Sequence, residues 1–291
     1  MPRSSEAEIR KIERAIRRGL LVTPPSHSRG SDALDMSEYS GFSFGTGPQT
    51  NFVYLYIHGP DSGIELQFSI ISIKKNFPGA ARITIIGDKP TWYDGHHIPS
   101  PRVRSSRDRD ARMPWRDTQH KIMLAANSDE IDEKFVWIMD DAFMLKPTTV
   151  AQMEQPHYDP WYKVNMKSTW HQLIRASFLE LEKRGKTTLQ MGTHLPCVFR
   201  KSKLKEMFDE YNFTHQLLLF DVLYSNHFPG SKSPVPYAGT WDGKTHPSFL
   251  KRFISKAKRS DLEAMDANFM NYASKCWTPT MRSWLEGALL E

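Results

Sequence analysis

Residues 51–88 read NFVYLYIHGPDSGIELQFSIISIKKNFPGAARITIIGD, and this stretch decides the fold. Two runs rich in β-branched and aromatic residues, 51–59 and 81–88, predict buried strands. Residues 63–76 between them repeat isoleucine and phenylalanine at helical spacing and stop at Phe-Pro-Gly. A strand, a helix and a strand at this spacing form a βαβ unit, which predicts a parallel sheet with right-handed crossovers.

The rest of the chain extends this pattern. Residues 135–145, FVWIMDDAFML, predict a further buried strand, and residues 230–248 are rich in Gly, Pro and aromatic residues and predict a loop. Helical spacing predicts helices over residues 118–131, 169–184, 201–211, 214–227 and 260–275. We therefore expect an α/β protein, a Rossmann-type sandwich with a mixed, mostly parallel sheet and a helical C-terminal half.

Three parts are expected along the chain. Residues 1–50 begin with a basic amphipathic helix and continue as a Ser-, Gly- and Pro-rich linker or arm. Residues 51–150 form a Rossmann-like half. Residues 151–291 form a mostly helical half of the same domain.

Composition narrows the class of protein. The chain has 291 residues, of which 39% are hydrophobic, enough for a substantial core. Because no apolar run approaches the roughly 18 residues of a membrane span, and no signal peptide is recognisable, we expect a cytoplasmic protein. Cys197 and Cys276 are far apart and lack CxxC spacing, so neither a disulfide framework nor a cysteine zinc site is indicated.

Positive charge is concentrated in one segment. The net charge is +6, and residues 102–116 contain six arginines together with Trp115. These arginines are Arg102, Arg104, Arg107, Arg109, Arg112 and Arg116. Such a cluster attracts phosphate-bearing partners, either a nucleotide-sugar or a nucleic acid, and a solvated surface fits the pattern equally well.

Asp140 and Asp141 are the strongest chemical signal. They follow four apolar strand residues and precede further apolar residues. Two adjacent carboxylates in such a place are costly unless a cation or a basic partner compensates them. Mg²⁺ or Mn²⁺ would do so and could also bridge a nucleotide diphosphate. In open α/β sheets, ligands lie at the carboxyl ends of the strands. The alternative is that the two acids only cap a turn.

A family resemblance rests on these motifs. FVYLYIHG, ARITIIGDKP and FVWIMDDAF, in this order, resemble the GT-A glycosyltransferases and their DxD-type metal motif. The stretch GIELQFSIISIKKNFPGAARITIIGDKPTW, together with IMDDAFML and THLPCVFRKSKLKEMFDEY, is similar to the Stealth-type sugar-phosphate transferases. The likeness covers about residues 52–228. This chain has Asp-Asp-Ala rather than Asp-x-Asp, which leaves the division of work between the two acids open.

The resemblance implies a GT-A-like fold, a nucleotide-sugar donor and Mn²⁺ or Mg²⁺ as cofactor. It implies that residues 51–150 bind the nucleotide-sugar and that residues 151–291 bind the acceptor. It implies that Ile57, His58 and Gly59 lie near the base and ribose of the donor, together with Asp88. Lys121, on the helix before the metal strand, suits a phosphate or a sugar hydroxyl, and Arg116 is its rival. Asp140 would contact the donor and would also be a metal ligand.

The second half supplies further candidates. His194, in Gly-Thr-His-Leu-Pro, suits a metal ligand, an acceptor-positioning group or a base, and a buried core histidine fits the same pattern. His246 is a candidate third metal ligand, with Lys244 as a phosphate partner. Asp221 is an acid within the apolar run LLLFDVLYSN, where burial can raise its pKa and suit it to base catalysis, or where it pairs with an arginine.

The sequence thus predicts a metal-dependent glycosyltransferase with Asp141, Asp221 and His194 as catalytic candidates and a UDP-sugar as the favoured donor. One candidate acceptor is hydroxymethylpyrimidine in double-stranded DNA, as in phage DNA hypermodification, which would place the protein in the host cytoplasm. The arginines and Trp115 would then contact DNA. Two alternatives stay open: sugar-phosphate transfer to a glycan, and a non-catalytic nucleic-acid-binding protein.

Overall fold

The computed structural model describes residues 43–58, 63–103, 113–160, 162, 166, 168–213, 215–230, 232–236, 251–254, 259–263, 267–272 and 277–290. The predicted N-terminal helix lies outside these residues. The same is true of the predicted site residues Gly59, Arg104, Arg107, Arg109, Arg112, Lys244 and His246, and of Cys276.

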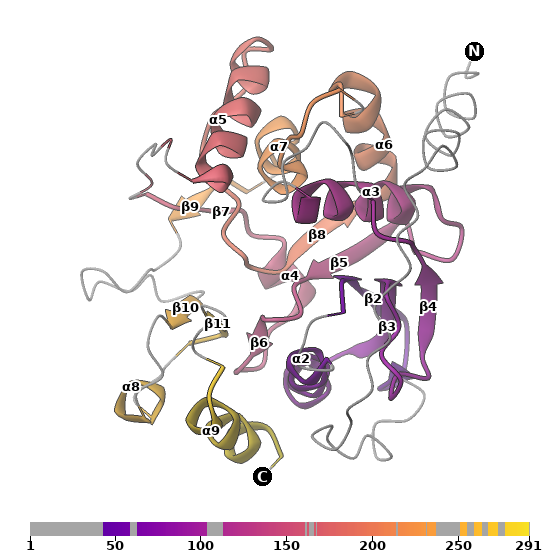
Figure 1. Ribbon diagram of the computed structural model, residues 1–291, viewed down its shortest axis with the longest axis vertical. Coiled ribbons are helices and arrows are strands. Elements are labelled where there is room, and N and C mark those ends of the chain that lie inside the picture. Colours follow the sequence, from indigo (N-terminus) through magenta and orange to yellow (C-terminus); the bar gives the residue numbers. More distant parts are fainter. Residues whose placement is uncertain are drawn as a thin grey trace.

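A six-stranded sheet forms the centre of the molecule (Figure 1). Its strands are β1 (Ser43–Phe44), β2 (Gln49–Tyr56), β3 (Ala80–Gly87), β4 (His96–Pro99), β5 (Lys134–Ile138) and β8 (Cys197–Arg200). The order is β1-β3-β2-β5-β8, and β4 also pairs with β3. The pairs β2–β3, β2–β5 and β3–β4 are parallel, while β1 and β8 run antiparallel to their neighbours. The predicted mixed, mostly parallel sheet is confirmed.

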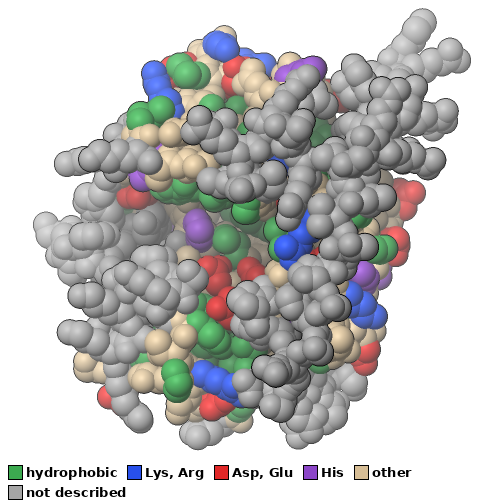
Figure 2. Space-filling view, viewed as in Figure 1, with side chains coloured by type: hydrophobic (Ala, Val, Ile, Leu, Met, Phe, Trp, Pro, Cys, Tyr) green, Lys and Arg blue, Asp and Glu red, His purple; other side chains and the backbone are tan. Residues whose placement is uncertain are grey.

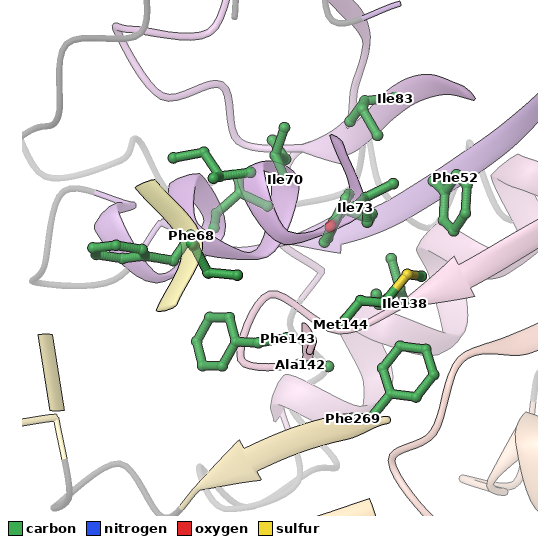
Figure 3. Close-up of a cluster of buried hydrophobic side chains, with 14 of the residues drawn as sticks. Phe52, Phe68, Ile70, Ile73, Ile83, Ile138, Ala142, Phe143, Met144 and Phe269 are labelled. Carbon is green, nitrogen blue, oxygen red and sulfur yellow. The ribbon is translucent and has the colours of Figure 1, made fainter. Parts of the chain in front are cut away.

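Helices cover both faces of this sheet, α2 (Ile64–Asn76) on one side and α3 (Met113–Asn127) on the other (Figure 1). Successive residues of β2 enter different cores, Tyr54 on the α2 side and Val53 on the α3 side. A strand with both faces buried is apolar throughout, which explains the continuous apolar run in its sequence. Figure 3 shows the α2-side core, where Phe68 and Ile73 lie near Phe143 and Met144.

The second half adds helices to the α3 side. These are α5 (Thr169–Glu182), α6 (Lys201–Glu210) and α7 (Phe220–His227). Helix α6 packs on α3, and α5 packs on α7. A short helix, α4 (Val150–Met153), precedes the two-stranded sheet of β7 (His157–Tyr158) and β9 (Val235–Pro236). The helix predicted from residue 214 begins only at Phe220, because Gln216 closes a turn on Asn212.

The C-terminal segment covers the α2 side. Strands β6 (Phe143–Met144), β10 (Lys251–Ile254) and β11 (Phe269–Tyr272) form a three-stranded sheet, with α8 (Arg259–Glu263) and α9 (Pro279–Leu290) beside it. Helix α9 packs on α2. The single helix predicted over 260–275 is wrong, because β11 pairs with β6 and β10. Such long-range pairing overrides local helical preference.

Two further boundaries differ from the prediction. The strand predicted over 135–145 is interrupted between β5 and β6, where Ala142 donates its N–H to the carbonyl of Met139 at 3.2 Å and closes a turn. Helix α3 runs from residue 113 to 127 instead of 118 to 131. None of the helices in the described ranges is long and apolar enough to cross a membrane.

Candidate active site

The order of the strands locates the candidate site. From β2 the chain moves through α2 to β3, and from β4 it returns through α3 to β5 on the other side of β2. In open α/β sheets, ligands bind at the carboxyl ends of the strands where the direction of winding reverses. Here that point lies between β2 and β5, where Tyr54 pairs with Ile138. The predicted residues Ile57, His58, Asp140 and Asp141 follow these two strand ends directly.

Asp140 and Asp141 occupy the centre of the turn that follows β5, and both are partly exposed. Helix α2 holds this turn in place through hydrogen bonds. The hydroxyl of Ser69 donates to the carbonyl of Ala142 at 2.6 Å and lies 3.5 Å from the carbonyl of Met139. The hydroxyl of Tyr54, on β2, bonds to Ser69 at 2.8 Å. Both flanks of the carboxylate pair are therefore bound to the central βαβ unit.

The same helix also holds the next residues of the chain. The N–H of Met144 donates to the Ser72 hydroxyl at 2.9 Å, and the Asn76 amide donates to the Met144 carbonyl at 2.7 Å. With Glu65 and Ser69, these residues form a polar stripe on one face of α2. This stripe was not predicted, although polar residues at 65, 69, 72 and 76 in a largely apolar helix have helical spacing and signal a buried polar contact.

Strand β11 brings a tyrosine to the carboxylates. Burial raises the pKa of Tyr272, the nearby charge of Glu65 raises it further, and the charges of Asp141 and Asp140 add to the effect. Its ring stacks on Phe143 with centroids 5.8 Å apart. Figure 2 shows acidic side chains gathered near the middle of the face drawn there. Neither Glu65 nor Tyr272 was predicted, because the pairing of β11 with β6 is not visible in the local sequence.

The carboxyl ends of β2 and β3 form one wall of the site, which we call the β2–β3 wall (Ile57, His58, Asp88, Arg102 and Lys121). Asp88 accepts the N–H of His58 at 2.8 Å and the guanidinium of Arg102 at 3.1 Å, and Arg102 donates to the carbonyl of His58 at 2.7 Å. Burial raises the pKa of Asp88, but these two donors outweigh it and bring the pKa below its ordinary value. The main chain after β2 is thereby held from both sides.

Lys121 lies inside this wall. Its side chain is fully buried, and its ammonium contacts the Asp117 carboxylate at 2.5 Å and the Tyr56 carbonyl at 2.8 Å. Burial lowers the pKa of Lys121, and Asp117 opposes this shift. Asp117 also accepts the N–H of Val103 at 2.8 Å. The predicted phosphate contact of Lys121 is thus replaced in this structure by bonds within the protein, which position the end of β2.

Gly87 makes room for this lysine. It has a φ of +128°, and a Cβ at this position would stand 2.1 Å from the Tyr56 carbonyl oxygen and 2.7 Å from the Lys121 Cε and Nζ atoms. Only glycine fits both the backbone angle and the space. The site therefore needs glycine at the end of β3.

The opposite wall, which we call the α7 wall, consists of residues 190–194 and Asp221. Strand β8 runs antiparallel to β5 and pairs Cys197 with Trp137, so the segment that leads into β8 reaches the edge where Asp140 follows β5. His194 lies on this segment with a φ of +56°, which is uncommon for a non-glycine residue, and its Nδ1 is 3.4 Å from the Asn271 amide of β11. His194 and Asp140 are thus brought to one edge of the sheet.

Asp221 lies in the first turn of α7. It is partly exposed at its surface, yet the surrounding protein desolvates it and raises its pKa to about 6, while the N–H groups of Val222 and Asp221 oppose the shift. A Cβ on Gly192 would stand 3.1 Å from the Asp221 carboxylate. Gln190 brackets the same glycine, accepting its N–H and donating to its carbonyl, both at 3.1 Å. Asp221 and the His194 segment therefore belong to one wall.

The described residues provide two carboxylates for a divalent cation. No group of three metal-ligating side chains occurs among them, and the predicted third ligand, His246, lies outside. Mg²⁺ is often bound through one or two carboxylates, with water and substrate phosphates completing its shell. Asp140 and Asp141, adjacent and partly exposed on a fixed turn, fit this mode of binding.

The predicted DNA contacts are only partly within the described residues. Arg102 is bonded to Asp88 and His58, and Arg116 donates to the carbonyl of Phe213 at 3.2 Å. Trp115 is partly buried against the α3-side core. These three residues have roles inside the protein, and a DNA contact by the arginine segment stays a prediction.

Comparisons with known proteins give the following result. No family model matches the sequence, and no curated protein matches it. Among solved structures, the chain is similar to an active-site mutant of LgtC, with a TM-score of 0.42 and 11% identity over 83% of this chain and 97% of that chain. It is also similar to a glycosyltransferase involved in the glycosylation of the major capsid of PBCV-1, with a TM-score of 0.36 and 12% identity over 84% of this chain and 100% of that chain. No family is assigned at this level of similarity.

Proposed function

We propose that this chain is a metal-dependent glycosyltransferase that moves a sugar from a nucleotide diphosphate donor to a hydroxyl acceptor. One observation carries the proposal. Two adjacent carboxylates, Asp140 and Asp141, lie on a fixed turn at the carboxyl end of a parallel strand, where the winding of the sheet reverses. The sequence resemblance to GT-A glycosyltransferases points to the same chemistry.

The β2–β3 wall is assigned to the donor. Ile57 and His58 follow the strand beside the carboxylates, and their main chain is fixed by Asp88 and Arg102. A rigid wall of this kind suits the flat base and ribose of a nucleotide, with UDP as the favoured donor. Lys121 acts as a positioning residue, because its ammonium holds the Tyr56 carbonyl from inside. Asp140 and Asp141 would hold Mn²⁺ or Mg²⁺, and a bound ion would neutralise charge on the departing diphosphate.

The α7 wall is assigned to the acceptor. With a pKa of about 6, Asp221 is ionised at neutral pH and basic enough to take a proton. In the proposed step, the acceptor oxygen bonds to the anomeric carbon and the bond from that carbon to the diphosphate breaks. The acceptor proton passes to Asp221, with His194 as the rival base, and the nucleoside diphosphate leaves.

The test is a donor screen on the purified chain. The protein is incubated with Mn²⁺ or Mg²⁺ and a panel of nucleotide-sugars, and released nucleotides are separated by chromatography. We expect metal-dependent release of a nucleoside diphosphate from one donor, reduced about 100-fold or more in Asp140→Asn and Asp141→Asn. Asp129→Asn, at an exposed site before β5, is the matched control and should behave as the parent protein.

Other outcomes separate the alternatives. Release of a nucleoside monophosphate would replace glycosyl transfer by sugar-phosphate transfer at the same carboxylates. If no nucleotide is released from any donor, and if salt-sensitive DNA binding persists in Asp140→Asn and Asp141→Asn, the chain is a nucleic-acid-binding protein instead. A hydroxymethylpyrimidine duplex, analysed by mass spectrometry of its nucleosides, tests the predicted DNA acceptor.

A further inference from the structure

Three aromatic rings cluster at the start of α5. Tyr162 stacks on His171 with centroids 5.6 Å apart and planes 18° apart, and Trp170 meets both rings edge-on, at 6.1 Å and 5.1 Å. All three side chains are partly exposed. The Ser168 hydroxyl caps the helix, accepting the N–H of His171 at 3.2 Å and bonding its Nδ1 at 2.5 Å. The histidine ring is therefore held in a fixed orientation.

The Tyr162 hydroxyl is the second observation. Its oxygen is buried, and among the described residues it has no hydrogen-bond partner. Buried tyrosine hydroxyls ordinarily have one. Burial raises the pKa of Tyr162, and the charge of Asp159 raises it further, so the phenol stays protonated and can donate. A ligand oxygen would satisfy this donor once the side chains that cover it move aside on binding.

A short series of contacts joins the cluster to the α7 wall. The N–H of Tyr162 lies 3.5 Å from the carbonyl of Asp159, and the N–H of Asp159 donates to the Gln190 carbonyl at 2.8 Å. Gln190 in turn brackets Gly192, which abuts the Asp221 carboxylate. The rings thus lie on the side of the molecule that carries the proposed base.

We propose that Tyr162, Trp170 and His171 bind a pyranose ring of a neutral glycan acceptor. This inference rests on the proposed function and names its acceptor class. A sugar ring presents apolar C–H faces to aromatic side chains and hydroxyls to the Tyr162 phenol and the Asp159 carboxylate. Among the described residues, the charged group that shifts the pKa of the Tyr162 phenol is a carboxylate, that of Asp159. Asp221 adds a second carboxylate to this side of the molecule. Carboxylates favour hydroxyl donors and disfavour the phosphates of DNA.

The first experiment measures binding and needs neither donor nor metal. Methyl glycosides of glucose, galactose, mannose and N-acetylglucosamine are tested on the full chain by saturation-transfer NMR. We expect one or more to bind, and the signal to disappear in Trp170→Ala. Phe208→Leu truncates a ring at another edge of the same core and serves as the matched control. Thermal unfolding of each variant shows that it is folded.

The second experiment measures transfer to the sugar that binds. We expect Trp170→Ala to raise the acceptor KM about ten-fold, a typical effect of removing one stacking ring. Donor hydrolysis without acceptor should stay within about two-fold of the parent, because the cluster does not touch the donor. Trp170→Phe should recover most of the affinity, and Tyr162→Phe should raise KM by removing only the hydroxyl.

Different results overturn different claims. If no glycoside binds, or if binding survives Trp170→Ala, the glycan site is refuted even though donor hydrolysis persists. Transfer to the hydroxymethylpyrimidine duplex that is unaffected by Trp170→Ala refutes it as well and restores the DNA acceptor. Failure of the proposed function is a separate result, seen as absence of donor hydrolysis in the parent protein.

Discussion

The β2–β3 wall is held by charged side chains bonded to main-chain atoms, whereas the α7 wall is held by a neutral amide around a glycine. In the first, Lys121 and Arg102 reach the carbonyls of Tyr56 and His58, and each cation has an acid beside it. In the second, Gln190 brackets Gly192, and Asp221 lies against that glycine.

Because of this difference, substitutions at the two walls should affect different properties, stability at one and reactivity at the other. Removing one partner of a buried, compensated ion pair leaves the other charge buried, so substitution of Lys121 or Asp117 at the β2–β3 wall should act mainly by unfolding the protein, whereas the more exposed Arg102–Asp88 pair should contribute little to stability. The α7 wall contains a desolvated acid whose environment favours its protonated form, so substitution there should change chemistry and pH dependence while leaving the protein folded. The two walls can therefore be distinguished experimentally.

The largest effect is expected for Lys121→Met. It leaves Asp117 buried without its cation, and we expect the free energy of unfolding to fall by about 3–5 kcal/mol, measured by urea denaturation. The double variant Asp117→Asn/Lys121→Met removes both charges and keeps an acceptor for the Val103 N–H, so it should recover much of this loss. Lys205→Met, at an exposed site on α6, is the control. If Lys121→Met and Lys205→Met lower the free energy of unfolding by the same small amount, the proposed difference between the two walls is wrong.

Asp221→Asn tests the other wall. We expect kcat to fall about 100-fold, as for loss of a general base, with the protein still folded. In the parent protein, activity should fall as the pH drops through about 6, and this acid limb should be absent from the residual activity of the variant. If His194→Asn removes the limb instead, His194 is the base.

The same residue gives a stability prediction. Because the folded state raises the pKa of Asp221 from 3.8 to about 6, the folded protein binds this proton more tightly than the unfolded chain does. The contribution of Asp221 to stability is present below about pH 4 and is lost as the pH rises to about 6. The Tm of Asp221→Asn relative to the parent should therefore rise between pH 4 and pH 7. An unchanged difference would show that Asp221 is not desolvated.

Ser69→Ala should have an intermediate effect. It removes the donor to the Ala142 carbonyl and leaves Tyr54 without this hydroxyl, so we expect a loss of about 1–3 kcal/mol in unfolding free energy. Because the turn that bears Asp140 and Asp141 is released, kcat should fall as well. Ser177→Ala, which removes a buried hydroxyl bonded within the α5–α7 pair, should lower stability without changing the affinity for Mn²⁺.

The smallest effect on stability is expected for Arg102→Met. The Arg102 side chain is 32% exposed and that of Asp88 is 19% exposed, so their ion pair should contribute about 1 kcal/mol or less. The donor KM should nevertheless rise, because the main chain of His58 loses a donor. An unchanged donor KM would show that the donor does not bind at the β2–β3 wall.

Much of the sheet could be predicted because its signal is local. The apolar runs around Val53 and Ile85 and the helix between them have clear periodicity, and the structure places all three elements where periodicity predicts. Asp140 and Asp141 were recognisable because adjacent acids interrupt an apolar segment. The turn itself was not, since it depends on Ser69, which is 70 residues away from Met139.

The C-terminal strand shows the opposite case. Residues 260–275 contain good helix formers, yet Phe269–Tyr272 forms β11 because it pairs with β6 and β10. A pairing with residues more than a hundred positions earlier leaves no trace in a local window. Glu65 and Tyr272 could not be placed at the site for this reason, and the roles of Lys121 and Arg102 were obscured because cations at helix starts and in loops are ordinarily exposed.

Gly87 and Lys121 are coupled by space. Because a side chain at residue 87 would collide with the Tyr56 carbonyl oxygen and with the lysine stem, residue 87 cannot change while Lys121 and the end of β2 stay in place. A distant relative that keeps the lysine must keep the glycine, and one that loses the lysine still needs glycine for as long as the main chain after β2 lies this close. The pair therefore offers a two-position marker for recognising proteins that share this edge of the sheet when overall identity has fallen too low to align.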